Sequence, residues 1–393
     1  GGKFKTLYSN FYFLISVFLL FAVISVFFAP SKGLAIYSFI RLLAYVLFAF
    51  AAGKILSDKK NFERALAILA ALAVLQSLIG IWQFKTQDDL GLQVLGEPPI
   101  GAFDPGTSKV FLDGMKFVRA YGAFPHPNAL AAFLILGLCA LYYFWLKRPS
   151  ERKFFSGIRT ALSDAVIGIG IFAVSLGLLF TFSRTGWAIA LAATAFISAY
   201  AIIARARFIQ GVRLAVLSIA IFGILVFNFN DYIFPRAQIS RTEPAVTQRL
   251  AYNDLALQLI KEKPFGVGIG NQVLYSVKNG LYQKLGMNES WQWQPIHNIY
   301  LFISSEIGVL GATSFLLFIA ALLISNFKFL IPNQTLNPKV QNSKIGNSTM
   351  MLLALLLFGL TDHFLWTLPQ GQLMLWLAIG FTLASARSPD VPV

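Results

Sequence analysis

Long apolar runs separated by polar segments dominate the chain. Each run has at least about 17 residues, the length that an α-helix needs to cross the hydrocarbon core of a bilayer. The runs lie at residues 11–28, 34–53, 64–84, 127–146, 163–182, 186–204, 213–229, 299–327, 349–366 and 371–387. This pattern predicts an all-α polytopic membrane protein with about ten transmembrane helices in a single membrane domain over residues 1–393.

Two polar intervals, residues 85–126 and 230–296, are much longer than the others. Loops of more than about 12–15 residues are usually functional or disordered. Both intervals contain aromatic residues and are punctuated by Gly and Pro, so we expect ordered loops.

The second interval contains a helical pattern of its own. From Thr247 to Lys261 the apolar residues on one side of a helix are Leu250, Leu255, Leu259 and Ile260. This spacing predicts an amphipathic helix that lies along the membrane surface and is stopped by Pro264. Glycines at 266, 268 and 270 then predict a backbone segment that is flexible or closely approached.

The distribution of charge predicts which segments face the cytoplasm, where Lys and Arg concentrate. The N-terminus, 54–64, 147–164, 205–213, 328–348 and the C-terminus together hold 18 of the 32 Lys and Arg residues but only 5 of the 17 Asp and Glu residues. We expect these segments to be cytoplasmic, which places both long loops on the outer face.

The amino-acid composition also indicates a membrane protein rather than a soluble one. The chain is 57% hydrophobic and 12% charged, with 38 Phe residues, which is more apolar surface than a soluble protein of this size could bury. The net charge of +15 is mostly positive-inside bias, so nucleic-acid binding is an unnecessary hypothesis. Cys139 is the single cysteine, which excludes a disulfide framework and a cysteine-based metal site.

Three arginines lie at the predicted outer ends of helices. Arg184, in FSRTGW, occupies a short turn at the hydrocarbon boundary, where an arginine must snorkel, pair or face a polar cavity. Arg119 lies close to the membrane without an obvious acidic neighbour, and Arg249 lies in the first turn of the amphipathic helix. Guanidinium groups match phosphate oxygens, so phosphate binding stands beside the plainer interpretation of snorkelling side chains.

Two histidines lie where an outer loop meets a helix. In GAFPHPNALAAFL, His126 and the prolines around it form a rigid helix start that Asn128 is able to cap. In QPIHNIYLFISSEIG, His297 is either a helix cap or the base that accepts a proton from a sugar hydroxyl. Glu306 lies deeper in the same helix, where we expect it to pair with an arginine.

The sequence lacks the motifs typical of metal-dependent chemistry. The outer loops contain no Asp-x-Asp pair, no carboxylate cluster and no His pair at metal-ligand spacing, although Asp362 and His363 form an outward-facing pair without an assigned role. We therefore expect neither a metal nor a cofactor. Several arginines and one histidine above apolar helices fit a lipid diphosphate, which is itself a good leaving group.

An ordered set of motifs over about residues 118–312 resembles the O-antigen ligase and polymerase superfamily: GAFPHPNALAAFL, FSRTGW, an arginine followed by PFGVGIGN, and HNIYLFISSEIGVLG. The resemblance implies a polytopic glycosyltransferase of the bacterial inner membrane that uses undecaprenyl-diphosphate-linked glycans on the periplasmic face. Members are metal-independent and inverting. Ligases commonly have two more helices than the ten counted here, which implies helices before Gly1.

The resemblance also implies roles for individual residues. Arg184 and Arg249 hold the diphosphate, with Arg119 as a third candidate, and His297 is the catalytic base. The supporting residues are Asn298, Glu306 and Asn128. The implied partners are the undecaprenyl-diphosphate glycan, an acceptor (glycan, lipid A core or protein) and membrane lipids.

The acceptor remains open among a ligase that uses lipid A core, a polymerase that uses another lipid-linked glycan, and a protein O-oligosaccharyltransferase. We favour the ligase because the single histidine with a loop arginine matches that pattern best. A transporter for a lipid-linked glycan is the alternative of another class. Transporter sites lie near the membrane midplane between repeated halves, whereas here the Arg and His residues gather at one face and no repeat is visible.

We predict that Arg184→Ala or Arg249→Ala abolishes glycan transfer while the protein still inserts, because each removes a charge that neutralises the diphosphate. The measurement is glycan transfer by each purified variant, with membrane insertion checked in parallel. Full transfer by both variants would show that these arginines do not hold a diphosphate.

Overall fold

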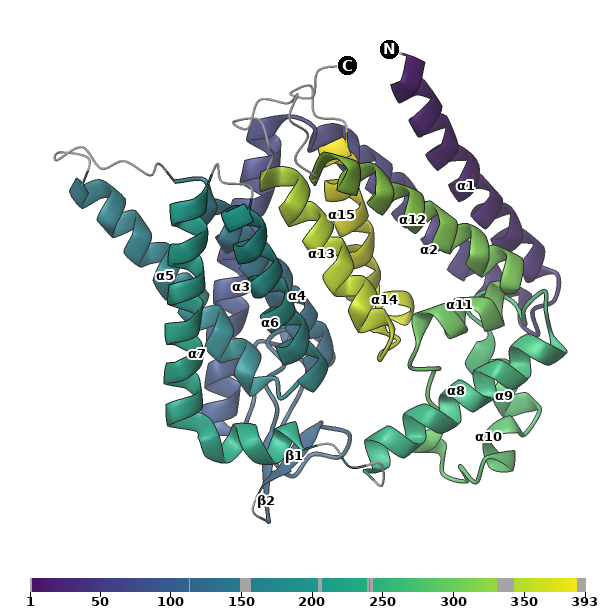
Figure 1. The fold of residues 1–393 in the computed structure, drawn as a ribbon. Coiled ribbons are helices and arrows are strands. Elements are labelled where there is room, and N and C mark those ends of the chain that lie inside the picture. Colours follow the sequence, from purple (N-terminus) through teal and green to yellow (C-terminus); the bar gives the residue numbers. More distant parts are fainter. Residues whose placement is uncertain are drawn as a thin grey trace. The chain divides into compact units, whose positions relative to one another are not determined.

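The computed structural model describes residues 2–112, 114–148, 157–203, 207–238, 240, 243–330 and 343–386. Within these ranges the regular structure is helical except for one two-stranded hairpin (Figure 1). The chain forms two compact units, each assembled from separated segments. The first unit comprises residues 1–54, 240–328 and 359–393, and the second comprises 55–239 and 329–358.

Five long helices build most of the second unit: α3 (Lys59–Thr86), α4 (Pro127–Leu146), α5 (Gly157–Phe180), α6 (Arg184–Ile203) and α7 (Phe208–Ala237). Helix α4 contacts each of the other four. This central position explains its composition, because α4 is apolar on every side and 83% of its membrane-length window is buried, against 17% for α7. The unit also contains most of α13 (Ser343–Gly359).

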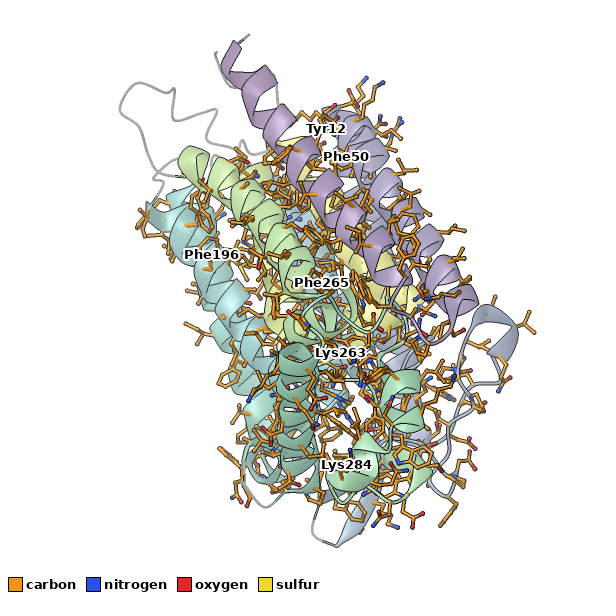
Figure 2. All side chains as sticks on the ribbon, turned by 90° about the vertical axis from the view of Figure 1, so that its right-hand side faces the viewer. Tyr12, Phe50, Phe196, Lys263, Phe265 and Lys284 are labelled. Carbon is orange, nitrogen blue, oxygen red and sulfur yellow. The ribbon has the colours of Figure 1, made fainter. Side chains whose placement is uncertain are left out.

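The first unit combines long apolar helices with a cluster of short ones. Its elements are α1 (Gly2–Val26), α2 (Lys32–Ile55), α8 (Pro244–Glu262), α9 (Gln272–Lys278), α10 (Leu281–Lys284), α11 (Ile299–Ile307), α12 (Val309–Leu330), α14 (Phe364–Thr367) and α15 (Pro369–Ala386). Aromatic rings join the long helices. Tyr12 of α1 stacks on Phe50 of α2 with ring centroids 5.0 Å apart (Figure 2), and Phe18 of α1 lies 5.2 Å from Phe315 of α12.

Among the described residues, each predicted apolar run lies mostly in helix. Seven helices of the described residues are long and apolar enough to span a membrane, and the apolar parts of α1 and α13 are shorter. The predicted run 299–327 was wrong as one continuous helix, because it divides at Gly308 into α11 and α12. Gly308 has φ +89°, and a Cβ there would lie 2.6 Å from the Pro264 oxygen, so the chain turns where only glycine fits.

The predicted run 349–366 is also interrupted. Helix α13 ends at Gly359 and α14 begins at Phe364, so Asp362 and His363 lie in a turn between helices. The first long loop contains an element that the all-α prediction missed, the antiparallel hairpin of β1 (Lys109–Leu112) and β2 (Met115–Val118). Four-residue strands carry too little periodicity to be recognised in sequence.

The helix predicted over residues 247–261 is present as α8, and its position along the membrane surface stays a prediction. Its buried side chains are Tyr252, Leu255, Ala256 and Leu259. The predicted apolar face was wrong at Leu250, which is exposed, and Tyr252 takes its place in the buried set. The buried face therefore keeps Leu255 and Leu259 from the predicted one, while Tyr252 and Ala256 are buried in place of Leu250 and Ile260.

The glycine-rich segment after α8 packs directly on the end of α11. Val267 N donates to Ser305 O at 2.9 Å, and Gly268 N donates to Glu306 O at 3.0 Å. Gly266 has φ +84°, and a Cβ on it would lie 2.2 Å from the Glu306 oxygen. The close-approach alternative is thus the correct one of the two predicted for these glycines.

We predict that Gly266→Ala destabilises the fold by clearly more than the ~1–2 kcal/mol that a left-handed alanine costs by itself, because its Cβ also meets backbone. Gly286→Ala is the matched control, since Gly286 has φ +75° with open space around its Cβ position. Thermal unfolding of both variants in one detergent measures the difference. Equal losses would contradict the packing described for Gly266.

Candidate functional site

The site is built around His297, which lies immediately before helix α11. Asn298 is the N-cap of that helix, and its side-chain oxygen accepts from Tyr300 N at 3.0 Å and from Leu301 N at 3.2 Å. The preceding loop is held by two tyrosines: Tyr252 donates to Gln292 O and Tyr282 donates to Gln294 O, both at 2.7 Å. The histidine therefore sits on a short, fixed connection rather than on a free loop.

One hydrogen bond determines the tautomer of His297. Its Nδ1 lies 2.8 Å from the carbonyl oxygen of Pro295. A carbonyl oxygen only accepts, so Nδ1 carries the proton and Nε2 of the neutral ring presents a lone pair. The ring also stacks on Tyr252 of α8, with centroids 5.1 Å apart and planes 10° from parallel.

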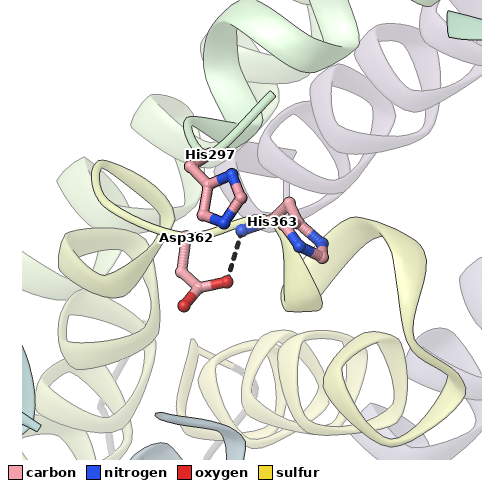
Figure 3. A group of neighbouring side chains, drawn as sticks. All are labelled: His297, Asp362 and His363. Carbon is pink, nitrogen blue, oxygen red and sulfur yellow. Dashed lines mark hydrogen bonds between the residues drawn. The ribbon is translucent and has the colours of Figure 1, made fainter. Parts of the chain in front are cut away.

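Asp362 and His363 complete a cluster with His297 (Figure 3). The Asp362 carboxylate accepts from His363 N at 2.7 Å, which shapes the turn before α14. The His363 ring meets His297 edge-on, with centroids 4.7 Å apart and planes at 87°. One ligand atom from each of the three residues lies within 4.8 Å of the other two, so these side chains could also hold a metal ion.

This cluster revises the sequence interpretation in one respect. The chain shows no His pair at metal-ligand spacing, because His297 and His363 belong to segments far apart in sequence. The fold brings them together with Asp362, whose pairing with His363 was noticed without a role. The only sequence signal was that two charged or titratable residues, in TDHFLWTLPQG, interrupt an apolar run.

Burial keeps His297 neutral. The pKa of His297 is lowered to about 4, mainly by burial and also by His363 and Arg249, while the nearby Asp362 carboxylate acts in the opposite direction. Burial likewise lowers the pKa of His363. At neutral pH both rings are therefore uncharged, and Asp362 is positioned to stabilise a proton that arrives on His297.

Arg249 is the predicted phosphate ligand that the fold brings to this cluster. It lies three residues before Tyr252 on α8, so both side chains share one side of the helix. Its charge acts on both histidines, and among the described residues it has no hydrogen-bond or ion-pair partner. An anionic ligand beside His297 would therefore meet a cation that the protein does not neutralise.

Glu306 does not form the expected ion pair with an arginine among the described residues. Its carboxylate accepts from Gln272 N at 3.1 Å and from Trp366 Nε1 at 3.0 Å. The side chain is 1% exposed. Glu306 thus joins α9 and α11 to α14, the helix that follows the Asp362–His363 turn.

Arg41 is a further cation that the sequence interpretation did not single out. It lines a cavity of about 200 Å³ together with Pro295, Glu306 and Trp366. Its buried Nε has no hydrogen-bond partner among the described residues. An arginine within the apolar run 34–53 was the signal that could have identified it.

The other two predicted arginines belong to the second unit. Arg119 is buried and donates to Thr181 O at 2.6 Å, to Ser108 Oγ at 3.0 Å and to Asn128 Oδ1 at 2.9 Å.

The predicted cap of α4 was wrong: His126 is the N-cap and accepts from Asn128 N, while Asn128 lies inside the helix. With proline at the first helical position, the cap lies two residues earlier than expected.

Arg184 begins helix α6, directly after the turn that it was predicted to occupy. Its Nη1 donates to Gln238 O at 2.9 Å, and the residue is half-buried. The turn itself contains Phe182, which has φ +49° although it is not glycine. Such a backbone persists only where its surroundings hold it, and here Arg236 Nε donates to Phe182 O at 3.1 Å.

Residues 169–316 match the protein family described as O-antigen ligase. The matched segment includes Arg184, Arg249, His297 and Glu306. It ends before Asp362 and His363 and begins after Arg119. No match was found among curated proteins.

We predict that the imidazole signal of His297 titrates near pH 4 and that Asp362→Asn moves its pKa still lower, because the carboxylate that favours the charged ring is lost. Histidine-selective NMR suits this test, since the chain has three histidines. The folded-state pKa of His297 lies below the ~6.5 of an unfolded histidine. The contribution of this residue to the free energy of unfolding is therefore fully present above pH 6.5 and is lost as the pH drops toward 4. A His297 pKa near 6.5 would contradict the burial described here.

Proposed function

The chain belongs, through residues 169–316, to the O-antigen ligase superfamily, and from that premise we propose that it transfers a glycan from undecaprenyl diphosphate to an acceptor hydroxyl. The reaction takes place at the periplasmic face of a bacterial inner membrane, without a metal, and inverts the anomeric centre. The observation that carries the proposal is the orientation of His297, whose Nε2 lone pair is set by the Pro295 carbonyl.

The proposed reaction is a single displacement. The acceptor hydroxyl gives its proton to His297 Nε2 while its oxygen forms a bond to the anomeric carbon of the donor sugar. The bond from that carbon to the diphosphate oxygen breaks, and its electron pair leaves with the diphosphate. Attack opposite to the leaving group inverts the configuration, and no co-reactant is required.

Asp362 supports the histidine in this scheme. A neutral imidazole that takes up a proton becomes a buried cation, which costs free energy unless an opposite charge lies nearby. Asp362 supplies that charge, as its effect on the pKa of His297 indicates. We assign Asp362 to stabilisation of the imidazolium and Asn298 to capping the helix that holds the histidine.

The leaving diphosphate requires cations, and we assign Arg249 and Arg184 to it. Charge neutralisation of this kind is usually the largest contribution to such a transfer, since it acts where negative charge develops. Arg119 receives a different assignment. Its donors bind Thr181, Ser108 and Asn128 within the protein, so we propose that it shapes the turn before Arg184 rather than contacting the diphosphate.

A lipid donor also needs an apolar surface. In the second unit, α4 to α7 line a cavity of about 290 Å³ that reaches Trp187 and Ala237. Trp187 follows Arg184 by three residues. Ala237 directly precedes Gln238, whose carbonyl oxygen accepts a hydrogen bond from Arg184. We propose that this cavity accommodates part of the polyprenyl chain, which would bring the attached diphosphate close to Arg184.

The acceptor is proposed to be lipid A core, with polymerase and protein O-oligosaccharyltransferase activities as alternatives within the family. A lipid-linked glycan transporter is the alternative from another class. The buried, oriented base favours transfer over transport, because a transported glycan needs binding groups but no proton acceptor.

We predict that purified wild-type protein transfers glycan from undecaprenyl diphosphate to lipid A core and that His297→Ala lowers the rate by at least about a hundredfold, as loss of a general base does. Lys284→Ala, a surface change in α10, is the control and should retain the wild-type rate. Lengthened lipid-linked glycan would instead identify a polymerase. Equal transfer by wild type and His297→Ala would refute the proposed role of His297.

A further inference from the structure

We propose that His297, Asp362 and His363 form a binding site for a divalent transition-metal ion such as Zn²⁺, and that the bound ion switches the protein off. The site itself follows from geometry alone. The inhibitory effect rests on the proposed function, in which His297 Nε2 must be free to accept a proton.

The hydrogen bonds of the two histidines favour the same nitrogen, Nε2, as the ligand atom. His297 Nδ1 donates to the Pro295 carbonyl, which leaves Nε2 as the ligand atom. His363 Nδ1 lies 2.7 Å from Thr367 Oγ1, and that hydroxyl also lies 3.2 Å from the His363 carbonyl oxygen. We infer that the hydroxyl donates to this carbonyl and accepts from His363 Nδ1–H, which leaves the lone pair on His363 Nε2.

This arrangement is the one that metal-binding histidines use. A ligating histidine almost always donates its other ring N–H to a carbonyl, carboxylate or similar acceptor, which orients the ring and strengthens the ligand. Here each histidine has such an acceptor before any ion is bound. The three titratable side chains are therefore close together, and both histidines are also oriented as metal ligands.

The ligand set also fits the ion class. Two imidazoles and one carboxylate suit Zn²⁺ and its first-row neighbours, and three protein ligands leave a fourth position open. Bonds of ~2.1 Å in a tetrahedron place ligand atoms about 3.4 Å apart. The ligand atoms lie within 4.8 Å of one another, so small side-chain rotations complete the site.

Arg249 limits the affinity. Its positive charge acts on both histidines and therefore opposes a second cation in the same place. We infer a reversible site, weaker than a structural zinc site, at which bound metal and a catalytically free His297 exclude each other. A diphosphate that neutralises Arg249 would weaken this opposition.

The test uses Co²⁺ as a spectroscopic probe on the full chain in lipid nanodiscs, after removal of metal with a chelator. We expect visible Co²⁺ absorption that saturates at one ion per chain and is displaced by Zn²⁺. In His363→Asn, the side-chain amide still reaches Thr367 while the Nε2 ligand is lost, and affinity should fall at least about tenfold. His126→Ala, which removes a histidine in the second unit, should bind Co²⁺ as wild type does.

The same proteins separate binding from function. Zn²⁺ should inhibit glycan transfer by wild type, a chelator should restore it, and the inhibiting concentration should rise at least about tenfold in His363→Asn. Unaltered Co²⁺ affinity in His363→Asn, or no binding by wild type, would overturn the site. Binding without inhibition would leave the site standing and refute the switch, and it would also count against His297 as the base.

Melting curves in chelator show whether His363→Asn is folded. If it is not, Asp362→Asn serves as the second ligand variant for the Co²⁺ titration. That titration needs no enzymatic activity, so it decides the metal site even if the proposed transfer reaction fails.

Discussion

The hydrogen bond from His297 to the carbonyl of Pro295 is the interaction on which the proposed chemistry depends. An imidazole has two nitrogens with opposite roles in its neutral form, and the partner of one decides the role of the other. A backbone carbonyl is an unambiguous partner because it cannot donate. The Nε2 lone pair, whether it meets a hydroxyl proton or a metal ion, follows from that bond.

The rest of the first unit holds this bond and its neighbours in place. Glu306, buried at the end of α11, receives hydrogen bonds from the backbone of α9 and from Trp366 of α14. Helix α14 follows Asp362 and His363 directly, so the same carboxylate that anchors the helix of His297 also anchors the turn that faces it. The glycine-rich segment closes on this end of α11 because no side chain comes between the two backbones.

Charge is arranged around the histidine in two ways. Asp362 favours a proton on His297, whereas burial and Arg249 oppose it, and the balance leaves a neutral ring. Among the described residues Arg249 has no hydrogen-bond or ion-pair partner, whereas Arg41 acts electrostatically on the buried Glu306 carboxylate. Arg119, in contrast, donates its hydrogen bonds to other protein groups. Its position in the sequence did not indicate that it differs from the other arginines in this way. Only the hydrogen-bond partners separate a ligand-binding arginine from a structural one.

The sequence by itself determined the helical membrane class, the positions of the apolar runs and the helix α8, and it singled out His297 and Arg249, whose charge acts on that histidine in the structure. These properties are local: hydrophobic periodicity and length decide whether a segment is a membrane helix, and a charged residue at its end is visible in a short window. The tertiary structure decided the break at Gly308, the hairpin of the first loop and the association of His297 with Asp362 and His363. Each of these depends on contacts between segments far apart in the chain, and a pattern within one segment carries no record of which other segment will lie against it.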